Sequence, residues 1–213
     1  MFGVLALLVG VFLGGQSTDE AALSPQPAPA DAAEQAPAVL DYDIPASEPA
    51  GLVWQTVELG RGSTSIPFSG EHGPAVAQDG QWSGWAQTPT GALLAAWTIQ
   101  QAAGIRDNAA LANYWRQQAI TDPETLNLAV DSRPMNSPEI EVTPMGFEII
   151  NYSPIEVTVR LATAYEWGSQ RTQESSTVKV RWQNGDWRLV MLSDDRPRSQ
   201  ELSAEWPYIP WGG

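Results

Sequence analysis

Four runs of residues in which apolar and polar side chains alternate restrict the fold of this chain more than any other feature. They are "EIEVTPMGFEIINYS" (139–153), "IEVTVRLATAYEW" (155–167), "STVKVRWQ" (176–183) and "DWRLVML" (186–192). Alternation with a period of two is typical of strands that bury one face of a sheet. Asn184 and Gly185 separate the last two runs, and this pair readily adopts the positive φ angles of a tight hairpin turn. The pattern predicts four successive antiparallel strands.

Helix signals precede these strands. Thr88 is suited to cap a helix that begins at Pro89, and Gly104 is suited to follow its last turn. Two shorter helices are predicted in "DNAALANYWRQQAI" (107–120) and "DPETLNLAV" (122–130). Helices followed by a meander predict an α+β domain in which N-terminal helices pack on a curved four-stranded antiparallel sheet.

Two tryptophans flank the predicted hairpin turn. We interpret Trp182 and Trp187 as core residues, because aromatic residues on strands pack into cores more often than they clamp ligands. Trp97 falls on the predicted core face of the first helix, together with Leu93 and Ala96. This spacing predicts that the long helix packs against the sheet through an aromatic contact.

The first residues of the chain are uncharged and almost wholly apolar. We interpret residues 1–15 as a membrane anchor or signal segment, with residues 2–15 in contact with the membrane. The apolar run is shorter than the roughly 20 residues that a spanning helix needs, and no basic residue precedes it. A single-pass anchor, a cleaved signal peptide and a buried helix all remain open.

Residues 16–50 are rich in Ala, Pro and acidic residues and contain no Lys or Arg. Such a composition buries too little apolar surface to fold, so it predicts a linker, either a tether or a tail without a role. The expected organisation continues with an irregular lead-in that contains one short strand (51–80), the folded domain (81–195) and a Pro/aromatic tail (196–213). We expect the domain on the extracytoplasmic side of the cell membrane, with secretion as the alternative.

The composition argues against several classes of site. The formal net charge of −14 disfavours nucleic acid as a partner, and the absence of Cys removes thiolate metal sites. His72 is the single histidine, whereas acid–base catalysis and zinc sites generally use more than one such group. Asp131, Glu148 and Glu166 are conceivable paired carboxylates, although acids near strand edges are usually solvated. We expect no enzymatic activity, no cofactor and no metal.

Three segments carry a resemblance to a known family: residues 73–97, 146–165 and 178–191. They look like an uncharacterised actinobacterial membrane-anchored family with a cystatin-like cone domain of the nuclear-transport-factor-two-like superfamily, similar to TcpC-type conjugation proteins. The resemblance covers about residues 73–192. It implies a membrane-tethered component of a conjugation or secretion apparatus that contacts other membrane or secretion-apparatus proteins. Because such cones serve as enzymes, ligand binders and scaffolds alike, the alternative is a small-ligand-binding domain at the cell surface.

Two candidate sites follow. A pocket for a small apolar ligand is expected to be lined by four aromatic residues: Trp97, Tyr114, Trp115 and Tyr165. The tail "AEWPYIPWGG" offers Trp206, Tyr208 and Trp211 as anchors for a partner, because its prolines already restrict the backbone. The other interpretation is that the tail folds back onto its own domain. Self-association into a homo-oligomer also remains open.

Overall fold

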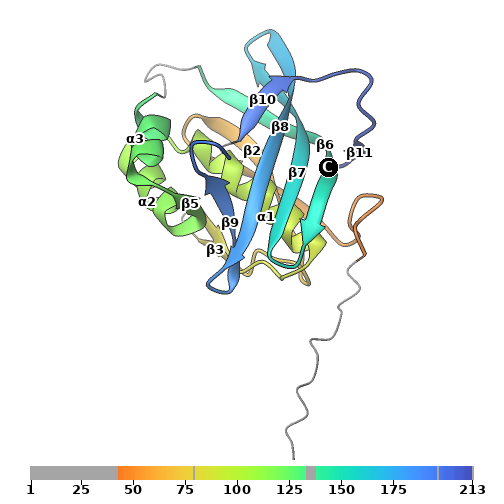
Figure 1. Cartoon of the computed structure of the whole chain (residues 1–213). Coiled ribbons are helices and arrows are strands. Elements are labelled where there is room, and N and C mark those ends of the chain that lie inside the picture. Colours follow the sequence, from red (N-terminus) through yellow and green to blue (C-terminus); the bar gives the residue numbers. More distant parts are fainter. Residues whose placement is uncertain (1–42, 79, 133–137, 196, 213) are drawn as a thin grey trace, which may run out of the picture. The chain divides into compact units, whose positions relative to one another are not determined.

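The predicted meander forms the centre of a larger, mixed sheet (Figure 1). The computed structural model describes residues 43–78, 80–132, 138–195 and 197–212. Its sheet has nine strands in the order β1-β2-β6-β7-β8-β9-β5, with β10 paired to β8 and β11 paired to β6. These strands are β1 (Val53–Glu58), β2 (Gly62–Phe68), β5 (Ala119–Thr121), β6 (Ile140–Ser153), β7 (Glu156–Trp167), β8 (Gln170–Gln183), β9 (Asp186–Met191), β10 (Arg198–Glu201) and β11 (Ile209–Pro210).

The expected fold class, helices on a four-stranded antiparallel sheet, is wrong. Strands β6 to β9 do form the predicted antiparallel meander, but five further strands extend it. Strand β2 pairs with β6 in parallel, and β5 pairs with β9 in parallel. The lead-in at 51–80 supplies β1, β2 and a short strand β3 (Val76–Gln78), which pairs with β4 (Gln81–Ser83). Strands β2 and β5 therefore form in segments with weak strand patterns, because each pairs with a strand far along the chain.

The helix starts are confirmed. Within the described residues the α-helices are α1 (Pro89–Gln101), α2 (Asn108–Gln118) and α3 (Pro123–Asp131), and a 3₁₀ turn η1 (Ala102–Gly104) follows α1. The side chains of Thr88, Asp107 and Asp122 each accept a hydrogen bond from the backbone N–H three residues later. Helix α2 ends two residues before the predicted limit, because Ala119–Thr121 pairs with β9 instead.

Helix α1 lies across one face of the sheet, and α2 and α3 lie beside β5 (Figure 1). Trp97 on α1 is fully buried, and its Nε1–H donates to the Ser65 carbonyl at 2.8 Å. Trp187 is also fully buried and donates from Nε1 to the Ala86 carbonyl at 2.9 Å. The partly buried Trp182 meets Trp187 edge to face, with centroids 5.4 Å apart. The interpretation as a core residue is confirmed for Trp187, whereas Trp182 is partly buried and packs against the core.

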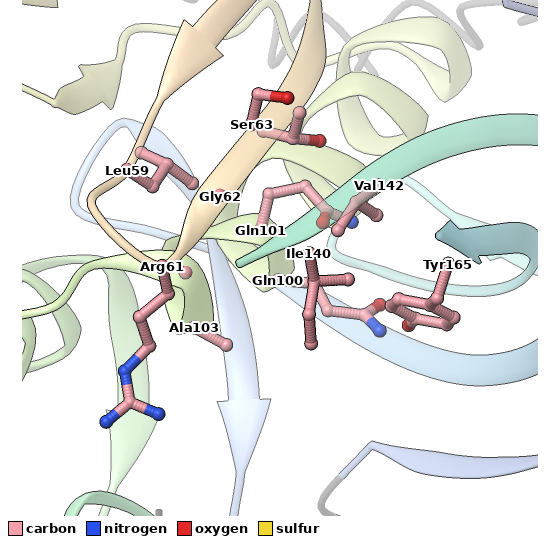
Figure 2. Close-up of a pocket in the computed structure, with 12 residues that line it drawn as sticks. Leu59, Arg61, Gly62, Ser63, Gln100, Gln101, Ala103, Ile140, Val142 and Tyr165 are labelled. Atoms are coloured by element: carbon pink, nitrogen blue, oxygen red, sulfur yellow. The ribbon is translucent and has the colours of Figure 1, made fainter. Parts of the chain in front are cut away.

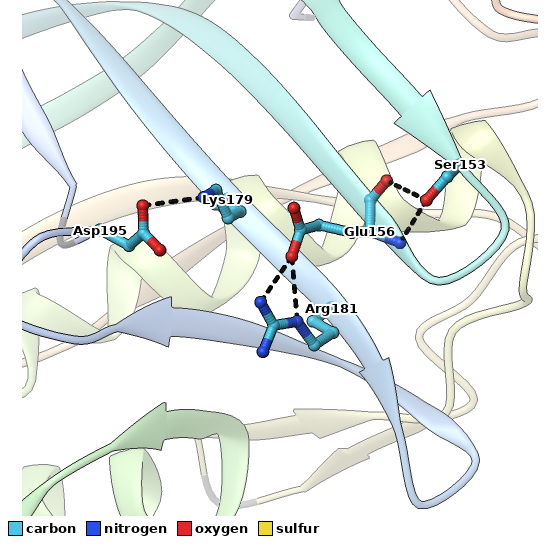
Figure 3. Close-up of polar contacts among 5 residues, drawn as sticks. All are labelled: Ser153, Glu156, Lys179, Arg181 and Asp195. Atoms are coloured by element: carbon cyan, nitrogen blue, oxygen red, sulfur yellow. Dashed lines mark hydrogen bonds and ion pairs between the residues drawn. The ribbon is translucent and has the colours of Figure 1, made fainter.

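The other face of the meander carries ion pairs (Figure 3). Arg181 of β8 and Glu156 of β7 are cross-strand neighbours, and the guanidinium donates twice to one carboxylate oxygen, at 2.6 and 3.0 Å. Lys179 donates to Asp195 at 2.8 Å. That hydrogen bond, more than the positive charges nearby, holds the pKa of the Asp195 carboxyl below its ordinary value. One face of the meander therefore packs against the core, and the other carries these ion pairs.

In the part of the chain that the structure describes, no helix is long and apolar enough to cross a membrane. The predicted anchor (1–15) and most of the predicted linker (16–50) lie outside the described residues.

Candidate functional site

The tail that follows β10 packs against its own domain. Ile209 and Pro210 form β11, which pairs with Phe147 and Gly146 of β6. The Trp211 N–H donates to the Met145 carbonyl at 3.2 Å, so the pairing continues one residue further. A segment that sequence reasoning treated as an appendage is therefore part of the sheet.

Trp211 is a core residue. It is 4% exposed, and its ring lies 5.3 Å from Trp54 of β1, 6.0 Å from Trp97 of α1 and 5.1 Å from Phe147 of β6, measured between centroids. Strand β2 pairs with β6 only between Gly62–Thr64 and Ile140–Val142, and β11 joins β6 beyond this point. Trp211 thus occupies the space where β2 has separated from β6, and its side chain is buried there.

The two other predicted anchors of the tail are half-buried on the domain. The Trp206 Nε1–H donates to Glu148 at 2.7 Å, and the Arg160 guanidinium lies 5.1 Å from the Trp206 ring. Tyr208 covers Gly146 so closely that a Cβ there would lie 2.0 Å from the tyrosine ring. The geometry fits the fold-back alternative for the tail.

Three of the four predicted pocket residues fill the core. Trp97, Tyr114 and Trp115 are 0%, 1% and 6% exposed. Burial raises the pKa of the Tyr114 hydroxyl far above its ordinary value, and the negative charge of Asp186 adds to the effect. The interior that was expected to hold a ligand is therefore packed by these side chains.

Tyr165, the fourth predicted residue, lines a cavity of about 260 Å³ (Figure 2). The cavity lies where the parallel segments of β2 and β6 meet the C-terminal end of α1. Burial raises the pKa of the Tyr165 hydroxyl to about 12, with a smaller contribution from Glu174, so the phenol is neutral near physiological pH. The lining residues are Leu59, Arg61, Gly62, Ser63, Thr64, Gln100, Gln101, Ala103, Gly104, Ile140, Val142 and Tyr165.

A second feature is the outer edge of β1. Strand β1 lies at one end of the strand order of the main sheet, so it has a strand beside it on one edge only, and that strand is β2. No backbone hydrogen bond joins its outer edge to another of the described residues. We call this outer edge of Val53–Glu58 the open edge.

Two of the three candidate carboxylates form ion pairs on the surface, and the third lies at the end of a helix. Glu148 lies 3.4 Å from Arg160, and Glu166 lies 3.3 Å from Arg171. Asp131 is the last residue of α3, so the structure does not bring the three acids into one site. The described residues contain no group of three or more His, Asp or Glu side chains able to hold a metal ion.

Sequence reasoning missed two buried polar residues. The Asp186 carboxylate is 8% exposed and accepts hydrogen bonds from the N–H groups of Gly84, Trp85 and Trp187, at 2.9, 3.1 and 3.0 Å. Thr64, which lines the cavity, is 2% exposed, and its Oγ1 has no hydrogen-bond partner among the described residues. The residues next to Asp186 and Thr64 in the sequence do not indicate that these side chains are buried, because the burial depends on segments far away in the chain.

Comparison with known proteins identifies the family to which the chain belongs. No curated protein and no solved structure matches the chain. A family described as "Domain of unknown function (DUF8175)" matches residues 16–207. The match includes α1 to α3 and every strand except β11. The chain therefore belongs to the DUF8175 family.

Proposed function

We propose that this protein is a non-enzymatic, membrane-tethered component of a conjugation or secretion apparatus, and that it acts through protein–protein contacts outside the cytoplasm. The observation that carries the proposal is the open edge of β1. The resemblance of residues 73–192 to membrane-anchored conjugation proteins and the apolar start of the chain support the same role.

The hairpin of β1 and β2 defines which backbone groups point to the open edge. The Leu59 N–H donates to the Gly62 carbonyl at 2.9 Å, which makes this a hydrogen-bonded pair. Hydrogen-bonded and non-hydrogen-bonded pairs alternate along an antiparallel ladder. The pairs of Thr56 with Ser65 and of Trp54 with Pro67 are therefore of the non-hydrogen-bonded kind, and the N–H and C=O groups of Thr56 and Trp54 point outward.

The open edge lacks the residues that usually protect such edges. Natural edge strands often carry Lys or Pro, which block pairing with another chain. The sequence of β1, "VWQTVE", contains neither, and its one charge is Glu58 at the end. The side chains of Trp54 and Val57 pack against the core, which holds the strand rigid, whereas Val53 is 59% exposed. A rigid, unprotected edge is suited to pair with an extended segment of a partner protein.

The experiment compares two substitutions at one position. Thr56→Pro removes an outward N–H and adds a ring at the open edge without removing a hydrogen bond to β2. Thr56→Val is the matched control, because it keeps the N–H. The tagged full chain is purified from detergent-solubilised native membranes, and apparatus ATPase and channel subunits are quantified by mass spectrometry. We expect the proline variant to recover about tenfold less of these subunits, since it loses backbone pairing.

Both variants should melt at the temperature of the unmodified protein. Equal recovery with Thr56→Pro and Thr56→Val would show that the open edge is not the contact. If the unmodified chain recovers no apparatus subunit, the proposed function is wrong.

A further inference from the structure

We propose that two copies of the chain pair through their β1 strands, so that the partner of each open edge is the open edge of a second copy. The pairing is antiparallel, about a two-fold axis that passes between the two Gln55 residues. It rests on the proposed function, because a shared membrane would confine the tethered copies and bring their edges together more often. A pair of copies also holds the apparatus through two attachments, so loss of the pairing weakens that association.

Strand β1 is accessible and already rigid. Its side chains at Val53, Gln55, Thr56 and Glu58 are exposed. The ring of Trp54, in contrast, packs against the core and meets Trp211 edge to face. A strand that is already formed loses little conformational freedom when it pairs with another chain.

The outward backbone groups of β1 determine how two copies can align. Those of Trp54 and Thr56 point to the open edge, because both residues form non-hydrogen-bonded pairs with β2. Trp54 of one copy can therefore face Thr56 of the other, and by symmetry Thr56 of the first copy then faces Trp54 of the second. Each of these two facing pairs contributes two backbone hydrogen bonds.

The side chains on one face of β1 match their own copies in this alignment. Gln55 faces Gln55 of the second copy, and an amide side chain both donates and accepts hydrogen bonds. Val53, which is 59% exposed, faces Val57 of the second copy and loses contact with water. A row of valine, glutamine and valine thus meets the same row in reverse. A second copy carries this row by symmetry, whereas an unrelated segment does not.

The same alignment keeps the charges apart. Glu58 is the one charged residue of β1, and it faces Leu52 of the second copy instead of the other Glu58. Like charges directly opposite each other destabilise a strand pair. Moving the axis by one residue, to Trp54 or to Thr56, would place Gln55 opposite a valine. Of these three alignments, the one centred on Gln55 alone pairs amide with amide and valine with valine.

The test uses the absence of Cys from the chain, because a single introduced Cys can form a disulfide only with a second copy or another protein. Gln55→Cys places two thiols in a non-hydrogen-bonded pair, whose Cα atoms lie about 4.5 Å apart, within the range that a disulfide requires. Val53→Cys is the matched control on the same exposed face. Its Cα lies about 13 Å along the strand from Val53 of the second copy, which is too far for a disulfide.

The full chain is oxidised mildly in its native membranes, and the covalent dimer is quantified on non-reducing gels and identified by mass spectrometry. We expect about tenfold more dimer from Gln55→Cys than from Val53→Cys, since only the former meets disulfide geometry. Adding Thr56→Pro to Gln55→Cys should remove the dimer, because the proline lacks an outward N–H. Adding Thr56→Val should leave the dimer unchanged. The melting temperatures of the variants verify that each is folded.

Three results would overturn the pairing. They are no dimer from Gln55→Cys, as much dimer from Val53→Cys as from Gln55→Cys, and a dimer that persists with Thr56→Pro. These results are distinguishable from failure of the proposed function. A chain that recovers apparatus subunits but forms no Gln55→Cys dimer refutes the pairing alone, whereas a dimer that recovers no apparatus subunit refutes the proposed function alone.

Discussion

The indole rings of Trp97 and Trp211 meet edge to face at the centre of the core, with centroids 6.0 Å apart and planes 79° apart. One ring comes from α1 and the other from the residue after β11. The contact joins the tail to the helix that the meander covers. The stability of the domain should therefore depend on its tail.

Replacing either ring should destabilise the domain strongly. Trp97→Ala and Trp211→Ala should each lower the free energy of unfolding by about 3–5 kcal/mol, because both side chains are buried. The double variant should lose about 1 kcal/mol less than the sum, since each single change already breaks the shared contact. Urea denaturation of the four proteins measures both effects.

Trp206→Ala is the matched control for the tail, because Trp206 is half-buried on the outer face. It should cost clearly less than Trp211→Ala. Deletion of residues 203–213 should lower the melting temperature at least as much as Trp211→Ala does. An unchanged melt after this deletion would contradict the packing of the tail against the core.

Removing the negative charge of Asp186 should weaken the link between β9 and the residues before α1. In Asp186→Asn one carboxylate oxygen becomes an NH₂ group that faces N–H donors from Gly84, Trp85 and Trp187. We expect a loss of about 2–3 kcal/mol in the free energy of unfolding, the value typical of hydrogen bonds to a charged group. The exposed Asp194→Asn is the control and should change stability by less than about 0.5 kcal/mol.

The cap of α3 should contribute stability in a pH-dependent way. Hydrogen bonds from the Thr125 N–H and then the Thr125 hydroxyl lower the pKa of the Asp122 carboxyl below its ordinary value of 3.8. A lowered pKa in the folded state means that the contribution is complete well above that value and is lost as the pH falls through the folded-state pKa. Asp122→Ala should therefore be less stable than the unmodified protein near pH 7, with a difference that narrows below about pH 4.

Urea denaturation across this pH range measures that difference. A constant difference between Asp122→Ala and the unmodified protein at all pH values would mean that the carboxylate charge has no part in the cap.

The proposed placement outside the cytoplasm predicts protease access. The apolar residues 2–15 are followed by a polar, Pro-rich segment that is suited to hold the domain off a membrane. Protease added to intact protoplasts should remove the domain, while a cytoplasmic marker protein stays intact. Full protection of the domain under these conditions would exclude the placement.

Local chemistry allowed the sequence to predict the ends of the elements. The caps at Thr88, Asp107 and Asp122 need only a side chain and a backbone three residues away. The turn at Asn184 and Gly185, with φ of 56° and 79°, likewise depends on the conformational preferences of two residues.

Strand β1 matches the short strand expected in the lead-in, but β2, β5, β10 and β11 could not be predicted in this way, since they pair with strands far away in the chain. Strand β2 begins in "GSTS" (62–65), which has no apolar alternation, and β11 consists of Ile209 and Pro210. The same segment of β2 supplies Thr64, so the cavity was missed together with the strand. Tyr165 was one of four aromatic residues expected to line a pocket, but the sequence does not distinguish it from the core residue Tyr114.

The contact between Trp54 and Trp211, with centroids 5.3 Å apart, also restricts when the molecule can fold. The first strand of the sheet and a segment made after every other strand meet in one aromatic cluster, so the core cannot close while the ribosome is still adding residues 209–211. Contacts between such distant segments are slow to form. Completion of this aromatic cluster therefore has to wait until residues 209–211 have been made.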